Sequence, residues 1–172
     1  MADLSLDPSI TNDSAKETWI ALMPGSKKAK LCIGVPFMLE VADRLKEQLK
    51  DCFFLLPIAP TTNIEEIKKL STHENPIAKN YTSGIKEIII ENNSREKKKL
   101  ITINGSIIHL EEETPAHLAL SKCDLAITTI GANTSELGAL CIPMIVIVPT
   151  QHMNVMNAWD GFLGLIARLP GI

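Results

Sequence analysis

The sequence predicts one α/β domain built on a doubly wound, mainly parallel sheet. Short apolar runs recur along the chain, and such runs are typical of strands buried on both faces of a parallel sheet. Segments with helical patterning separate most of these runs, as the crossover connections between parallel strands require. The length of 172 residues is enough for a single domain with a substantial hydrophobic core.

The first strand is expected at residues 18–23, "TWIALM", because this apolar run ends at a Pro-Gly-Ser turn. The next segment, "KKAKLCIGV", is expected to form a short helix. Pro36 then begins a second helix, since proline is tolerated in the first turn. This second helix carries an apolar stripe at spacings of three and four residues, formed by Met38, Val41, Leu45 and Leu49.

The middle of the chain predicts a strand, a short helix and an antiparallel unit. Residues 52–59, "CFFLLPIA", form the second strand, and Asn63 caps the helix "NIEEIKKLS", with Glu66 three residues further on. The isoleucine-rich segment that follows is broken at residues 92–94 and 104–105, so we expect a hairpin and one more strand.

The last third returns to the alternating pattern. Thr114 and Pro115 are expected to open a helix as its N-cap and first residue. A buried strand follows at residues 124–131, then a helix at 133–140 and a further strand, "CIPMIVIV". Residues 153–169 have helical patterning, interrupted by two glycines.

Composition limits the classes of function. The net charge of −3 gives no reason to expect a nucleic-acid partner. The histidines and cysteines lack the spacing of metal ligands, so no metal is expected. Residues 1–17 are expected to be a polar tail or linker and residues 18–172 the folded domain. The abrupt, apolar end "GFLGLIARLPGI" suggests a fragment of a longer protein.

Parallel α/β sheets bind ligands beyond the carboxyl ends of their strands, so the loops after three strands are candidate sites. The first loop holds Gly25, Ser26 and Lys27 at the start of a helix. Unpaired backbone N–H groups, the helix dipole and a lysine would together bind an anion there. The alternative is a capped turn with solvated lysines.

The second loop, "TTIGANTSE", contains Thr129 at the strand end, Gly131, Asn133, Thr134 and then Glu136. Glycine lets a ligand approach the backbone closely, and a carboxylate can accept hydrogen bonds from both vicinal hydroxyls of a ribose. The alternative is structural, because Asn133 and Glu136 have the spacing of a capping box. Spacing alone does not choose between these two interpretations.

The third loop places Gln151 and His152 after the last predicted strand, where ordinary surface residues would serve equally well. The three loops are expected at one edge of the sheet. Taken together, they indicate a site for a sugar nucleotide or a similar phosphorylated ligand.

Three segments resemble known glycosyltransferases. "LMPGSKKAK" is similar to the "LPGSR" segment that opens the C-terminal domain of lipid-A-disaccharide synthases, and "DLAITTIGANTSELGALCIPMIVIVPT" resembles a later segment of that family. "VPTQHMNVMNAW" is similar to the "VPxQHxxxxxNA" segment of muramyl-peptide N-acetylglucosaminyltransferases. The resemblance covers residues 20–159, more weakly within 64–110. It implies the donor-nucleotide-binding, Rossmann-like half of a two-domain (GT-B) glycosyltransferase.

The resemblance also implies roles for the candidate residues. Glu136 matches the glutamate that contacts the ribose of uridine diphosphate (UDP). The residues that match the diphosphate lining are Gly131, Asn133 and Thr134. Those that match the loop facing the cleft between domains are Gly25 and Ser26, and those that match residues near the donor sugar are Gln151 and His152. Lys27 stands where the family often has arginine, and so gives up a bidentate contact to phosphate.

The resemblance implies an inverting transfer without a metal, in which an acceptor hydroxyl attacks the anomeric carbon of a UDP-sugar and UDP leaves. The catalytic base and the acceptor site, for a sugar or a lipid, would belong to an N-terminal domain. This chain alone would then be inactive, and the whole enzyme would be cytoplasmic, beside a membrane if its acceptor is a lipid. The alternatives are a sugar-nucleotide epimerase of similar fold and a non-catalytic α/β interaction module.

Overall fold

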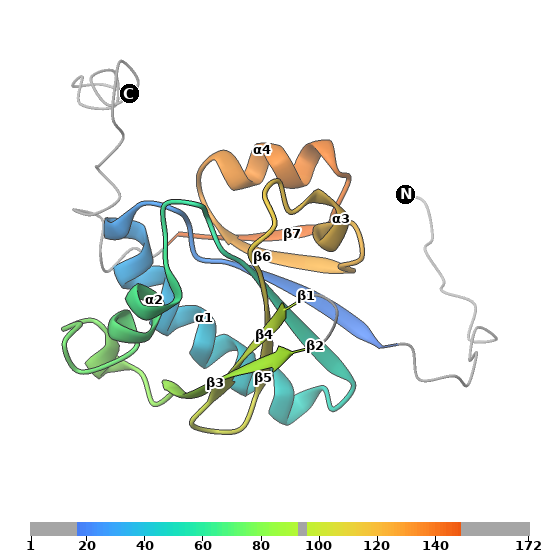
Figure 1. Cartoon of the computed structure of the whole chain (residues 1–172). Helices are drawn as coiled ribbons and strands as arrows, with labels where there is room; N and C mark the ends of the chain where they lie inside the picture. Colours follow the sequence, from blue (N-terminus) through green and yellow to red (C-terminus); the bar gives the residue numbers. More distant parts are fainter. Residues whose placement is uncertain (1–16, 93–95, 149–172) are drawn as a thin grey trace, which may run out of the picture.

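The computed structural model describes residues 17–92 and 96–148 (Figure 1). Within these residues the strands form one seven-stranded sheet in the order β3-β4-β5-β2-β1-β6-β7. The elements along the chain are β1 (Thr18–Met23), α1 (Lys28–Gln48), β2 (Cys52–Pro57), α2 (Ile64–Leu70), the 3₁₀ turn η1 (Ala78–Asn80), β3 (Ile85–Asn92), β4 (Glu96–Thr102), β5 (Ile107–Glu111), α3 (His117–Leu120), β6 (Leu125–Thr129), α4 (Ala132–Ala139) and β7 (Met144–Ile147).

The sheet is doubly wound, as predicted. Strands β5, β2, β1, β6 and β7 run parallel to one another, whereas β4 is antiparallel to both β3 and β5. The chain proceeds outward from β1 through β2 and then crosses back to β6 on the other side of β1. The winding direction therefore reverses between β1 and β6. This reversal is the place where folds of this Rossmann-like type bind ligands.

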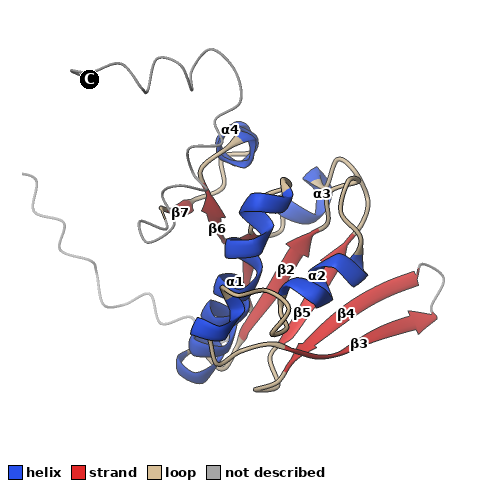
Figure 2. Ribbon diagram, turned by 90° about the vertical axis from the view of Figure 1, so that its left-hand side faces the viewer, coloured by secondary structure: helices blue, strands red, loops and turns tan. Residues whose placement is uncertain are grey.

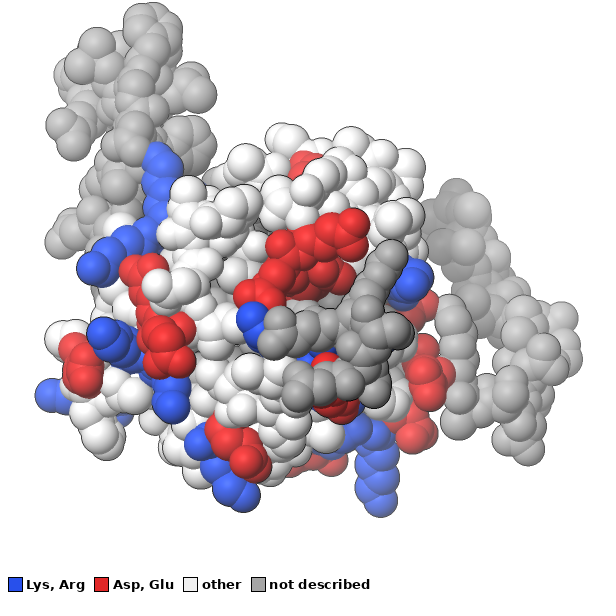
Figure 3. Space-filling model, in the orientation of Figure 1, with Lys and Arg blue, Asp and Glu red and all other residues white. Residues whose placement is uncertain are grey.

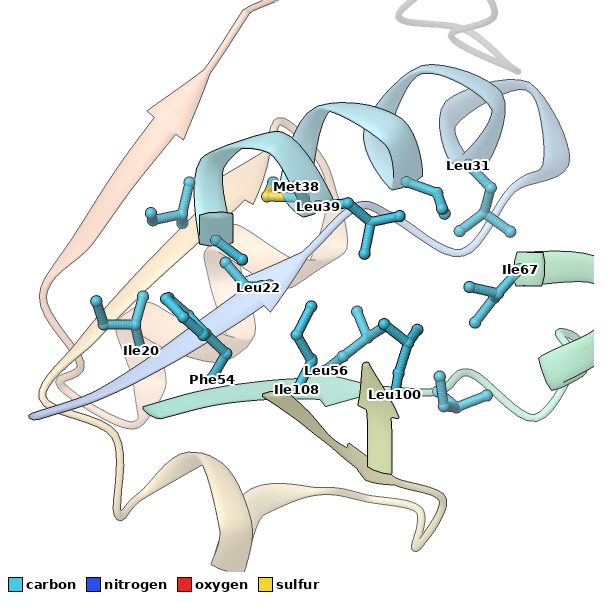
Figure 4. Packing of buried hydrophobic residues seen from close by; sticks show 14 of the residues in the cluster. Ile20, Leu22, Leu31, Met38, Leu39, Phe54, Leu56, Ile67, Leu100 and Ile108 are labelled. Atoms are coloured by element: carbon cyan, nitrogen blue, oxygen red, sulfur yellow. The ribbon is translucent and has the colours of Figure 1, made fainter. Parts of the chain in front are cut away.

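Helices cover both faces of the sheet (Figure 1, Figure 2). Successive residues of β1 point to opposite faces: Ile20 and Leu22 belong to the core beneath α1 and α2, and Ala21 and Met23 belong to the core beneath α3 and α4. Figure 4 shows the first core, in which side chains of α1 lie against β1, β2 and β5. Both faces of the central strands are therefore apolar, which explains their uninterrupted apolar runs.

Helix α1 corrects one prediction: residues 28–48 form a single helix that passes through Pro36. Proline has no N–H, so the carbonyl of Cys32, four residues earlier, loses its helical partner. The side chain of Asn75 replaces it, donating from Nδ2 to the oxygen of Cys32 at 2.7 Å and to that of Leu70 at 2.7 Å. Asn75 is buried, and its position between α2 and η1 lets α1 continue.

The predicted helix starts had different outcomes. Asn63 does cap α2, because its side chain accepts a hydrogen bond from the N–H of Glu66 at 2.6 Å. The prediction for Thr114 and Pro115 was wrong, since α3 begins only at His117, after Ala116 as N-cap. Residues 113–116 instead form part of the loop that follows β5, and the bond between Thr114 and Pro115 is cis.

A buried polar network joins α1 to the antiparallel part of the sheet. Glu40 accepts hydrogen bonds from the backbone N–H groups of Thr82 and Ser83 at 2.9 and 3.0 Å and pairs with Arg44 at 2.8 Å. One turn further along α1, Asp43 accepts hydrogen bonds from the residues that flank β3 and β4. Two carboxylates thus hold the predicted hairpin against the helix.

The Glu40 carboxylate should make folding stability depend on acid pH. Burial raises the pKa of Glu40, but the hydrogen bonds from Arg44, Thr82 and Ser83 outweigh this effect and hold its pKa below the ordinary value of 4.5. A carboxyl group with a lowered pKa stabilises the fold above its unfolded-state pKa, and this contribution is lost as the pH falls through the folded-state pKa. Urea unfolding from about pH 6 to about pH 3 should show a steeper loss of stability for the wild type than for Glu40→Gln. If stability falls equally steeply with pH in the wild type and in Glu40→Gln, the Glu40 carboxylate does not cause the acid dependence.

Among the described residues, no helix combines the length and apolar character needed to cross a membrane.

Candidate functional site

Four parallel strands end beside one pocket of about 180 Å³. Residues 23–26 after β1 and 57–60 after β2 line one part, and residues 113–116 after β5 line another. Asn133 and Glu136 come from α4, the helix after β6. Because parallel strands place their carboxyl ends at the same edge of a sheet, loops more than 100 residues apart in sequence meet here. Four of the predicted site residues, Gly25, Ser26, Asn133 and Glu136, therefore lie in one pocket.

The loop after β1 is pressed against the first turns of α1. Gly25 has a φ of +107°, a conformation that side chains other than glycine rarely adopt. Gly34, in α1, lies so close to Pro24 that an added Cβ would be 2.5 Å from its carbonyl oxygen. These two glycines let the chain turn tightly at the end of β1, so that Gly25 and Ser26 face the pocket.

Lys30, which sequence reasoning missed, lies between the two glycine loops. Its Nζ donates a hydrogen bond to the carbonyl oxygen of Ile130 at 2.6 Å. A Cβ added to Gly131 would be 2.9 Å from this Nζ, and one added to Gly25 would be 3.0 Å from the Cβ of Lys30. Burial and the nearby charge of Lys27 lower the pKa of Lys30. The signal was present in "PGSKKAK", where Lys30 lies one turn inside the helix that Lys27 begins.

Two other residues predicted in the second loop, Thr129 and Thr134, hold the loops beside the pocket in place through hydrogen bonds. Thr129 is buried, and its Oγ1 donates to the oxygen of Pro24 at 3.2 Å, which ties the end of β6 to the loop after β1. Thr134 donates from its Oγ1 to the oxygen of Gly131 at 2.7 Å. Lys27, Thr129, Gly131 and Thr134 do not line the pocket.

The capping-box interpretation of Asn133 and Glu136 is wrong. The N-cap of α4 is Gly131, with no side-chain capping bond, and Asn133 is already the second residue of the helix. Glu136 therefore lies two residues beyond the position from which a side chain reaches back to the N-cap backbone. Its carboxylate lines the pocket instead, with Oε1 3.2 Å from Nε2 of His117. His117, at the start of α3, is a second residue that sequence reasoning missed.

Charge is distributed unevenly around the pocket. Glu113 and Glu136 line it on the side of α3 and α4, whereas Lys30 lies between the glycine loops after β1 and β6. Figure 3 shows acidic side chains gathered near the centre of this view, with basic side chains scattered toward the rim. In the described part of the chain, no group of three or more His, Cys, Asp or Glu side chains could hold a metal ion.

A larger hollow, of about 650 Å³, lies on the other side of the loop formed by residues 113–116. Strand side chains such as those of Trp19, Lys97 and His109 line it, together with the loop after β5 and α3, and no residue from the loops after β1, β2 and β6 does. The smaller pocket is the better candidate because it lies at the reversal point of the sheet and is bordered by glycine turns and helix starts.

Gln151 and His152 lie outside the described residues, so their predicted place near the pocket stays a prediction.

Comparison with known proteins gives one distant similarity. No protein-family model matches the chain. It is 24% identical over 140 residues to the lipid-A-disaccharide synthase of Anaeromyxobacter dehalogenans (strain 2CP-C). The alignment covers 81% of this chain but 29% of that relative, so the chain spans less than a third of the relative's length. The similarity is thus a distant one to a glycosyltransferase.

Proposed function

We propose that this chain is the donor-nucleotide-binding domain of an inverting GT-B glycosyltransferase that uses a UDP-sugar. The observation that supports this most is the meeting of Gly25, Ser26, Asn133 and Glu136 in one pocket at the reversal point of the sheet. The distant similarity to a lipid-A-disaccharide synthase points the same way. A second domain would supply the acceptor site and the catalytic base.

The diphosphate would lie between the two glycine loops. Positive charge gathers at the start of α1, where Lys27 is the N-cap and Lys28 and Lys30 lie in the first turn. This first turn has no acidic residue. Cations at the positive end of a helix dipole are unfavourable unless an anion lies nearby. The ammonium of Lys30 uses one of its three hydrogens to bind Ile130, so others can be donated to phosphate oxygens. The tight turns at Gly25 and Gly131 let those oxygens approach the backbone.

The ribose would lie against Glu136. An ionised carboxylate has two oxygens and can accept hydrogen bonds from both vicinal hydroxyls of a ribose. Because Glu136 makes no capping bond in α4, the carboxylate is available for this role on the pocket side. The pocket of about 180 Å³ is smaller than most ligand sites, as expected for one half of a cleft between two domains.

The chemistry that follows from this placement is electrostatic. As the acceptor hydroxyl attacks the anomeric carbon, negative charge develops on the departing UDP. Lys30 and the N-terminus of α1 would stabilise that charge without a metal ion, because both would lie beside the proposed position of the diphosphate.

Replacing Glu136 with alanine should weaken UDP binding by about 10- to 100-fold, because hydrogen bonds to a charged group contribute about 1.5–3 kcal/mol. The change in folding stability should stay within about 0.5 kcal/mol, because the side chain is partly exposed and caps nothing. Isothermal titration of this chain with UDP, combined with thermal unfolding, measures both effects.

The matched control is Glu47→Ala, which removes an exposed glutamate near the opposite end of α1. It should bind UDP as the wild type does. If the wild type binds no UDP, the proposed function fails and the non-catalytic module becomes the better interpretation. If UDP binds but Glu136→Ala binds it equally well, the carboxylate does not hold the ribose.

A further inference from the structure

We infer that His117 is a positioning residue, which orients the Glu136 carboxylate for the ligand's vicinal hydroxyls. The inference rests on the proposed function and adds a residue to the same site. His117 precedes the buried part of α3, and its Nε2 is 3.2 Å from Oε1 of Glu136. The side chains are 52% and 31% exposed, so the pair lies at the surface and not in the core, and Glu136 is the member of the pair that lines the pocket.

The backbone around this pair is firmly anchored. Leu120, at the end of α3, and Leu137, the residue after Glu136, are both fully buried in the same hydrophobic cluster. The short helix α3 and the helix α4 are therefore held together beneath His117 and Glu136. This packing fixes the two backbone positions from which the His117 and Glu136 side chains extend.

The contact uses one carboxylate oxygen and leaves the other for the ligand. An ionised carboxylate has about four acceptor positions on its two oxygens, and only Oε1 lies close to Nε2 of His117. The ring can donate from Nε2 either as the neutral tautomer with its proton there or as the protonated form.

Orientation matters because a glutamate side chain has many rotamers. An unrestrained Glu136 would have to be ordered by the ligand, which lowers affinity by the cost of that ordering. With His117 in place, the Glu136 side chain is already ordered before the ligand binds. The free carboxylate oxygen is then presented to the pocket that Gly25, Ser26 and Asn133 also line.

The test compares UDP with 2′-deoxy-UDP on this chain. His117→Ala should weaken UDP binding by about three- to tenfold. His117→Ala should also reduce the preference for UDP over 2′-deoxy-UDP. The midpoint of thermal unfolding should stay unchanged, whereas the loss of a merely structural contact would lower it. His117→Gln, whose amide N–H can reach the same oxygen, should restore most of the affinity. His73→Ala, the control at an exposed histidine that lines neither hollow, should behave as the wild type.

A double-mutant cycle separates this inference from the proposed function. In the Glu136→Ala background, His117→Ala should have no further effect on UDP affinity, because its target is absent. If UDP binds and Glu136→Ala weakens it while His117→Ala does not, the positioning role is overturned and the proposed function stands. Tighter binding by His117→Ala would also overturn it, because His117 would then compete with the ribose for the carboxylate.

Discussion

Replacing Asp43 with alanine is expected to lower the free energy of unfolding by about 2–4 kcal/mol, although the residue is remote from the pocket. The Asp43 carboxylate accepts hydrogen bonds from the hydroxyl groups of Ser83 and Thr102, the latter at 2.5 Å, and from the side-chain amide of Asn104 at 3.0 Å. Ser83 and Thr102 are buried, so both hydroxyls would lose their acceptor without gaining water. Each buried polar group left unpaired costs about 1–3 kcal/mol.

Urea unfolding followed by circular dichroism measures this loss, and two variants define its cause. Asp43→Asn retains one acceptor oxygen and should fall between the wild type and Asp43→Ala. Asp51→Ala removes an exposed aspartate in the turn before β2, and its stability should stay within about 0.5 kcal/mol of the wild type. If Asp43→Ala unfolds at the same urea concentration as Asp51→Ala, the network does not hold the hairpin to α1.

The Asp43 network also shows what local patterns reveal and what they do not. Apolar runs located β1, β2 and β6 because these strands lie in a parallel sheet whose faces are covered by helices. The break predicted near Pro36 was wrong because the partner that replaces its missing N–H, Asn75, is distant in sequence. Hydrogen bonds between distant residues leave no periodic trace in the sequence. The contact between Asn75 and Cys32 is one of these, and it explains why α1 continues through Pro36.

The same distinction applies to the site. Gly25 and Ser26 could be predicted to line the pocket, because glycine and small polar residues directly after a strand indicate a ligand loop in a parallel sheet, whereas Glu136 was singled out by the resemblance and not by its spacing. His117 could not be predicted, since its partner lies on another element, and the lysine-rich segment after β1 did not reveal that Lys30 contacts Ile130. The spacing of Asn133 and Glu136 wrongly indicated a capping box for a related reason. The chain enters α4 through Gly131, two residues before Asn133, and spacing does not report where a helix begins.

Gly34 provides the sharpest test of how the fold positions the loop after β1. In Gly34→Ala, the added Cβ would lie 2.5 Å from the oxygen and 2.8 Å from the Cα of Pro24. These are backbone atoms, so α1 and the loop must move apart. Overpacking of this kind costs about 1–3 kcal/mol, and at these distances from backbone atoms it outweighs the gain of about 1 kcal/mol that alanine brings to a helix interior.

Gly138→Ala is the matched control, because the same substitution in α4 meets no atom within 4 Å. It should stabilise the chain by about 0.5–1 kcal/mol through helix propensity alone. The two variants should therefore shift the midpoint of urea unfolding in opposite directions. Gly34→Ala should also weaken UDP binding, since the displaced loop carries Gly25 and Ser26. If Gly34→Ala is stabilised as Gly138→Ala is, then α1 does not pack against Pro24, and the loop is not held where a diphosphate would need it.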